Sequence, residues 1–175
     1  MTVSPSTPAP TWQNPGPVER LRILRETRTV AVVGASANPA RASNFVSTYL
    51  LASTDYEVLV VNPNETRILG LPCYPSLAEL PVVPDLVDVF RRRADLPEVL
   101  DEVLALPPGV RTFWTQFGLF DEAVARRAEE AGLQVVMDRC LKVEHARFHG
   151  GLHVAGFDTG VISARRRSPD GVDPS

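Results

Sequence analysis

The residues of this sequence best placed to do chemistry stand between Gly34 and Arg41. An apolar run from Thr29 to Val33 ends there at a glycine, and small polar residues and an arginine follow it. A buried strand, a loop of small residues and a helix start form an anion site in doubly wound α/β domains, because the backbone can approach a phosphate and the helix presents unpaired N–H groups. The spacing therefore predicts a nucleotide-like ligand without specifying which one.

Five short apolar runs alternate with segments of helical periodicity along the chain. We expect strands at residues 29–33, 56–61, 86–90, 110–115 and 133–137. This alternation indicates a Rossmann-like, doubly wound α/β domain with a five-stranded parallel sheet and helices on both faces. Right-handed crossovers with one reversal of winding predict the strand order 3-2-1-4-5, with the ligand crevice at the carboxyl ends of the strands.

Short polar or sharply turned groups follow each of these runs. The carboxyl ends of parallel strands meet at one edge of the sheet, so these groups should lie together around the ligand. On the predicted order, Gln116 and Gly118 lie beside the first strand, across the point where the winding reverses. The groups expected to line the crevice are Gly34–Arg41, Asn62-Pro63, Phe90-Arg91, Thr115–Gly118 (which includes Phe117) and Asp138–Cys140. Within these groups, the residues expected to bind the ligand are Gly34, Ala35, Ser36, Arg41, Asn62, Pro63, Phe90, Arg91, Gln116, Gly118 and Cys140.

The length and composition of the chain limit its class. With 175 residues, of which 44% are hydrophobic, it can form one domain with a proper core but not two ordinary ones. Its net charge of −3 gives no electrostatic reason to expect nucleic acid or an anionic membrane as a partner. No apolar run approaches the roughly 18 residues of a membrane span, and no secretory signal is visible. Two cysteines are too few for a disulfide framework, so we expect a reduced, cytoplasmic protein.

Proline-rich and polar segments mark the expected domain boundaries. Residues 1–17 hold five prolines among small polar residues and should form a flexible or loosely attached arm. An arm docked through Trp12 is the alternative. The folded domain should run from residue 18 to residue 155, and the arginine-containing residues 156–175 should form a tail.

The loop after the first strand departs from two common nucleotide-binding patterns. The dinucleotide fingerprint has three glycines, whereas only Gly34 is present and Ser36 and Pro39 stand where the others would fall. That fingerprint also places an acidic residue after the second strand to bind ribose hydroxyls, and this chain has Asn62 there. A P-loop needs a lysine that the segment lacks. An NAD(P)-dependent oxidoreductase module is therefore kept only as an alternative.

Five motifs, taken together and in order, resemble one family. They are Ala31–Pro39 with Arg41, Val60–Pro63, Val87–Arg91, Trp114–Gly118, and Val135–Cys140 with Glu144 and His145. In this combination the chain looks like the small single-domain CoA-binding proteins, the YccU-like group, which are similar to the N-terminal CoA-binding domain of the succinyl-CoA synthetase α subunit. The resemblance covers roughly residues 18 to 150. It implies a Rossmann-like fold that binds coenzyme A or an acyl-CoA without an attached catalytic domain.

The residue types suit this ligand. CoA carries a pyrophosphate and a ribose phosphate, for which Arg41 at the expected helix start and Arg91 supply positive charge. Ser36 can donate its hydroxyl, Asn62-Pro63 forms a rigid turn for adenine or ribose, and Phe90 offers an apolar face. We therefore expect a small-molecule CoA ligand in the crevice, while the identity of any protein partner is left open.

Catalysis and metal binding have little support in the sequence. It contains no nucleophile elbow, no defensible Ser-His-Asp set and no carboxylate pair at a reaction centre, so we expect a carrier, sensor or adaptor rather than an enzyme. His145, His149 and His153 recur every four residues, but Gly150-Gly151 should end the helix before a zinc site forms. Cys140 could meet the thiol end of CoA as a mixed disulfide in a redox-linked protein; a buried, inert cysteine is the simpler interpretation.

Overall fold

The computed structural model of the protein describes residues 11–151. Within this range seven strands form one sheet: β1 (Thr29–Val33), β2 (Glu57–Val61), β3 (Arg67–Ile68), β4 (Leu71–Tyr74), β5 (Leu86–Val89), β6 (Thr112–Thr115) and β7 (Gln134–Val136). The α-helices of the same range are α1 (Pro17–Glu26), α2 (Ala42–Ser53), α3 (Leu96–Leu104), α4 (Glu122–Glu130) and α5 (Leu141–Ala146). None of these helices is long and apolar enough to cross a membrane.

The order of the strands differs from the predicted one. The sheet runs β3-β4-β2-β1-β5-β6-β7, with β3 antiparallel to β4 and every other neighbouring pair parallel. The α/β class with a mostly parallel sheet is confirmed, but the five-stranded sheet of order 3-2-1-4-5 is wrong. The strand that we expected beyond β2 is β5, but it pairs with β1 instead, with Val30 opposite Leu86. The strand that pairs with the other side of β2 is β4.

The strand β4 is hard to recognise in the sequence. Gly70 and Pro72 interrupt the apolar pattern there, and Pro72 is tolerated because β4 lies near the edge of the sheet. Counting β4 as the third strand gives a doubly wound order with one reversal of winding, between β1 and β5. Gln116 and Gly118 therefore do not lie beside the first strand as expected. Phe90 does, and its N–H donates to the Val33 carbonyl at 2.8 Å.

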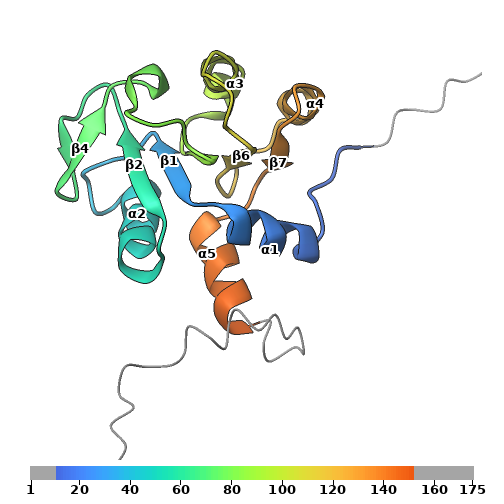
Figure 1. The fold of residues 1–175 in the computed structure, drawn as a ribbon, viewed down its shortest axis with the longest axis horizontal. Helices are drawn as coiled ribbons and strands as arrows, with labels where there is room; N and C mark the ends of the chain where they lie inside the picture. The colour runs from blue at the N-terminus through green and yellow to red at the C-terminus, as the bar shows by residue number, and fades with distance from the viewer. Residues whose placement is uncertain (1–10, 152–175) are drawn as a thin grey trace, which may run out of the picture.

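Helices cover both faces of the sheet (Figure 1). Successive side chains of a strand point to opposite faces, so Ala31 and Val33 pack in the layer of α3 and α4, whereas Val30 and Val32 pack in the layer of α1, α2 and α5. Trp114 belongs to the second layer. It is fully buried, and its indole N–H donates to the Arg139 carbonyl at 2.7 Å. The apolar run of β1 is thus explained by burial on both faces.

The described part of the proline-rich segment, which begins at residue 11, lies against the domain. Trp12 is buried; its backbone N–H donates to Glu122 Oε1 at 3.1 Å and its indole N–H to Glu129 Oε1 at 2.8 Å. Asn14 exchanges two hydrogen bonds with the backbone of Met137, at 2.7 and 2.8 Å. Of the two arrangements weighed for the arm, docking through Trp12 fits these residues. Residues 1–10 and 152–175, and with them the expected tail and His153, lie outside the described part.

Candidate functional site

Gly34 sets the turn from β1 towards α2. Its φ is +82°, a left-handed conformation that favours glycine. A Cβ atom at this position would stand 2.3 Å from the carbonyl oxygen of Phe90, directly after β5. The N–H groups of Gly34 and Ala35 both donate to the Val61 carbonyl at the end of β2, at 3.0 and 3.2 Å. One glycine thus lets the carboxyl ends of three strands meet.

Side-chain amides hold the loop that follows. Asn62 Nδ2 donates to the Ala35 carbonyl at 2.7 Å, and Asn44 Nδ2, from the first turn of α2, donates to the Ser36 carbonyl at 2.9 Å. The Ser36 hydroxyl oxygen accepts from the Asn38 N–H at 3.1 Å, so its hydrogen stays available to a ligand. Asn62, which we expected to face adenine or ribose, therefore uses its amide to fix the loop.

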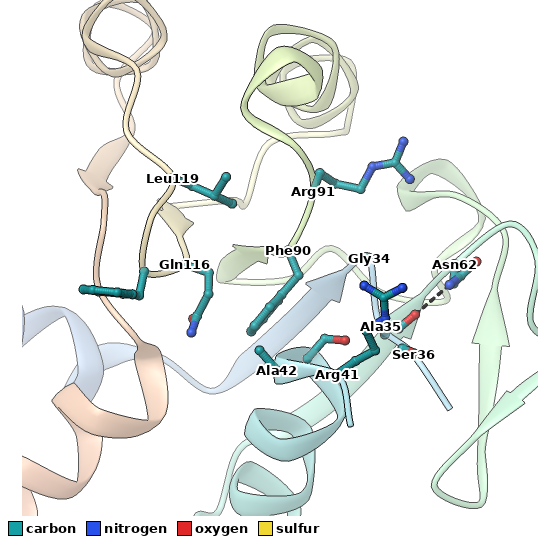
Figure 2. Close-up of a pocket in the computed structure, with 12 residues that line it drawn as sticks. Gly34, Ala35, Ser36, Arg41, Ala42, Asn62, Phe90, Arg91, Gln116 and Leu119 are labelled. Carbon is teal, nitrogen blue, oxygen red and sulfur yellow. Dashed lines mark hydrogen bonds between the residues drawn. The ribbon is translucent and has the colours of Figure 1, made fainter. Parts of the chain in front are cut away.

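These elements enclose a cavity of about 460 Å³ at the carboxyl ends of the central strands (Figure 2). Figure 2 shows the two arginines towards one end of it, Gln116 towards the other and Phe90 between them. Eight of the residues expected to bind the ligand line this cavity: Gly34, Ala35, Ser36, Arg41, Asn62, Phe90, Arg91 and Gln116. These eight residues thus lie around one cavity, as the sequence predicts. Their contacts with a ligand stay predictions.

Three of the residues expected to bind the ligand do not line this cavity. Pro63 is exposed in the turn after β2. Gly118 shapes the turn after β6, with φ of +87° and its N–H donating to Asp138 Oδ1 at 2.6 Å. Cys140 lies in a neighbouring cavity. Each follows a strand, as expected, but the local turn carries it away from the point where the strands meet.

Sequence reasoning missed three lining residues: Ala42, Ser43 and Leu119. Ala42 and Ser43 begin α2, and the first N–H groups of a helix have no partner inside it. Their position directly after Arg41 was a usable signal, because helix starts bind anions through these groups. Phe117, in the group expected after the fourth strand, does line the cavity, and it is 75% exposed.

The side chains that line the cavity include two arginines and no carboxylate. Arg41 is exposed at the N-cap of α2, where the helix dipole adds positive potential. Arg91 lies 3.7 Å from Asp95 and is 37% exposed. Asp95 is shared, because Arg92 also binds it and holds the pKa of that carboxyl below its usual range. The arrangement attracts an anion and leaves Arg91 able to exchange its partner for one.

Gln116 and Asp88 have buried side-chain oxygens without a hydrogen-bond partner among the described residues. Gln116 lines the cavity, and its buried Oε1 is unpartnered. Asp88, in β5, is wholly buried with both carboxyl oxygens unpartnered, and burial raises its pKa well above its ordinary value. Buried polar atoms normally have partners, so the Gln116 oxygen is a ready acceptor for a donor on a ligand.

A second cavity of about 650 Å³ adjoins the first and shares Gln116 and Phe117 with it. Cys140 lines this second cavity and is a free, half-buried thiol. A mixed disulfide at Cys140 therefore stays a prediction. The helical histidines lie elsewhere: His145 is buried, and its ring stacks on that of His149 with centroids 3.9 Å apart.

A doubly wound α/β domain with an anion-attracting cavity at the reversal of winding has the form of a nucleotide-binding domain. Residues 28–146 match the family described as CoA binding domain, and the chain belongs to this family. The Bacillus subtilis (strain 168) protein YneT is 40% identical over 134 residues, which cover 77% of this chain and 97% of YneT. The resemblance to small single-domain CoA-binding proteins is confirmed.

Two further relatives differ in how much of their own length the match covers. A solved structure from Thermus thermophilus, described as cell-free ID.343, has a TM-score of 0.70 at 38% identity and covers 76% of this chain and 98% of its own. Acetate–CoA ligase (ADP-forming) I of Archaeoglobus fulgidus is 26% identical over 122 residues. That match covers 65% of this chain but only 18% of the ligase, so the chain corresponds to a small part of that enzyme.

Proposed function

We propose that the protein binds coenzyme A or an acyl-CoA in the first cavity, as a carrier, sensor or adaptor. The observation that carries this proposal is the anion-attracting cavity at the start of α2, lined by two arginines and no carboxylate, in a chain of the CoA binding domain family. The CoA phosphates would meet Arg41, Arg91 and the first N–H groups of α2. Both cysteines of the chain are free, in keeping with a reducing compartment such as the cytoplasm.

The site suits CoA better than NAD. An NAD ribose is normally held by a carboxylate after the second strand, whereas Asn62 stands there and its amide is committed to the Ala35 carbonyl. The positive end of the cavity suits the additional phosphate of CoA. The described residues lining the cavity include no carboxylate, histidine or cysteine to act as a base or a strong nucleophile, which supports binding without catalysis.

Calorimetric titration of the full chain with CoA and NAD tests this proposal. We expect heat of binding with CoA and none with NAD. Arg41→Ala should weaken CoA binding by about 1–3 kcal/mol, because it removes a charge-assisted phosphate contact. The matched control is Arg25→Ala, since Arg25 is an exposed arginine in the last turn of α1, just before β1 begins and away from the carboxyl ends of the strands.

Each outcome has a clear reading. Absence of binding with CoA at millimolar concentration would reject the proposed function. An affinity that falls equally in both arginine variants would mean that Arg41 acts only through net charge. A mass spectrum of the purified protein, native and then denatured, provides an independent check by detecting CoA that stays bound during purification.

A further inference from the structure

We propose that the second cavity receives the acyl group of a bound CoA thioester and that the protein prefers apolar acyl-CoAs to free CoA. This inference rests on the proposed function, because it needs the nucleotide part of the ligand in the first cavity. The two cavities meet at Gln116 and Phe117, which line both. In Figure 2, Phe90 lies between the two arginines and Gln116, so a chain that leaves the phosphate end over Phe90 reaches Gln116, which also lines the second cavity.

Gln116 supplies a contact for the arm between the two ends of such a ligand. Gln116 is only 9% exposed, and its Oε1 has no hydrogen-bond partner among the described residues. The arm of CoA contains amide N–H groups, which are the donors that an unpartnered amide oxygen accepts. Gln116 can therefore bind the amide-containing arm of CoA where the two cavities meet.

The wall of the second cavity carries apolar side chains that the fold leaves exposed. Phe117 is 75% exposed, Phe120 37% and Val143 57%. The carboxylates of the same wall are already engaged: Glu144 pairs with Arg20 at 3.0 Å, and Asp138 accepts the Gly118 N–H. Arg139 and Arg147 also line this cavity, and both are exposed, so an apolar group entering here covers exposed hydrocarbon without burying an unpaired carboxylate.

The docked N-terminal segment completes this wall. Asn14 lines the second cavity, and the ring of Trp12 packs on that of Phe120 with centroids 5.8 Å apart. Trp12 is itself fixed to α4 by its two hydrogen bonds to glutamates. The segment precedes residues 28–146, which match the family, so the wall contains a part contributed from outside the matched domain.

The size of the effect follows from the burial of methylene groups. Each methylene transferred from water to an apolar site improves affinity about four-fold. Hexanoyl-CoA differs from acetyl-CoA only in methylenes, and both share the nucleotide with free CoA. We expect hexanoyl-CoA to bind at least about ten-fold more tightly than acetyl-CoA, which corresponds to partial burial of the chain.

Calorimetry with CoA, acetyl-CoA and hexanoyl-CoA on the full chain tests the inference. Val143→Asp places a charge in the second cavity at an exposed helical position, and it should reduce the ratio of hexanoyl-CoA to acetyl-CoA affinity to about one. Val18→Asp is the matched control: Val18 is 66% exposed in the first turn of α1 and lines neither cavity. This control should keep the ratio of the unmodified protein. Trp12→Ala, which frees Phe120, should lower the ratio as well.

The failures of the two proposals are distinguishable. If CoA binds but chain length makes no difference, the acyl cavity is rejected and CoA binding stands. If the preference exists but survives Val143→Asp, the chain lies elsewhere and the inference is likewise rejected. If none of the three ligands binds, the proposed function fails, and the acyl cavity fails with it.

Discussion

The substitution Gly34→Ala tests whether the site depends on the close approach of three strand ends. Gly34 combines a φ of +82° with a position where a Cβ atom would stand 2.3 Å from the Phe90 carbonyl oxygen. Alanine therefore meets two separate penalties, one from its own backbone conformation and one from the neighbouring strand. Both act at the loop that we propose binds phosphate.

The expected magnitude can be worked from this geometry. A non-glycine residue in the left-handed region costs about 1–2 kcal/mol. To relieve the contact, the Phe90 carbonyl must retreat by about 1 Å, towards the 3.4 Å at which ordinary contacts begin. That movement stretches the 2.8 Å hydrogen bond from the Phe90 N–H to Val33, worth about 1 kcal/mol. We expect the free energy of unfolding to fall by about 2–3 kcal/mol, with a Tm lower by about 4–12 °C.

Urea denaturation followed by circular dichroism measures this change, with Gly132→Ala as the matched control. Gly132 has a φ of +92° and nothing within 4 Å of an added Cβ atom, so its substitution reports the backbone penalty alone. The difference between the two variants isolates the contact with Phe90. Calorimetry with CoA on folded Gly34→Ala protein should show weaker binding, because the loop and the end of β5 have moved apart.

Equal destabilisation of the two glycine variants, within about 0.5 kcal/mol, would refute this reasoning. It would mean that the Phe90 carbonyl moves away without lowering the free energy of unfolding and that only the positive φ makes glycine necessary. Unchanged CoA affinity in a destabilised Gly34→Ala protein would instead separate the stability of the loop from its role in binding.

Two further predictions concern ionisable groups buried in the domain. Burial raises the pKa of Asp88 in the folded state, so the folded protein holds this proton more tightly than the unfolded chain and the contribution of Asp88 to stability falls as pH rises above about 4. As pH rises from 5 to 8, the unfolding free energy of Asp88→Asn should therefore increase relative to that of the unmodified protein, by at most about 1.4 kcal/mol per pH unit. A difference that does not depend on pH in urea titrations would contradict this. Arg20 and Glu144 form a buried ion pair at 3.0 Å between α1 and α5, so Arg20→Met should cost about 3–5 kcal/mol by leaving the carboxylate unpaired. The double variant Arg20→Met/Glu144→Met should recover much of that loss in the same denaturation measurement; no recovery would show that the pair acts through other contacts.

The sequence carries a strong local signal for the central part of this fold. The β-branched run of β1, the glycine after it and the arginine at the start of α2 lie within 13 residues, and their structure follows from local rules. The same holds for the positions of β2, β5, β6 and β7, whose apolar runs are explained by burial on both faces. Local pattern was weakest at β4, where a proline and a glycine concealed a short strand.

That one concealed strand explains the error in strand order. The sequence predicts an irregular crossing with a possible short edge strand at residues 66–74, so the doubly wound order counted five other strands. That order placed β5 at the outer edge and Gln116 beside β1. The hydrogen bonds instead place Phe90 beside Val33, and Gln116 one strand further away, with its N–H donating to Val89. Strand order depends on which edges remain free for pairing, which no single stretch of sequence specifies.

Periodicity and the ends of parallel strands are enough to predict the class of the fold, the motifs after each strand and most of the residues that line the first cavity. Tertiary structure alone decided that the Asn62 amide holds the loop, that Cys140 lies in a second cavity and that Trp12 docks on α4. These outcomes depend on contacts between residues far apart in the chain, such as Trp12 and Glu129, and only the packed sheet and helices bring such residues within hydrogen-bonding distance.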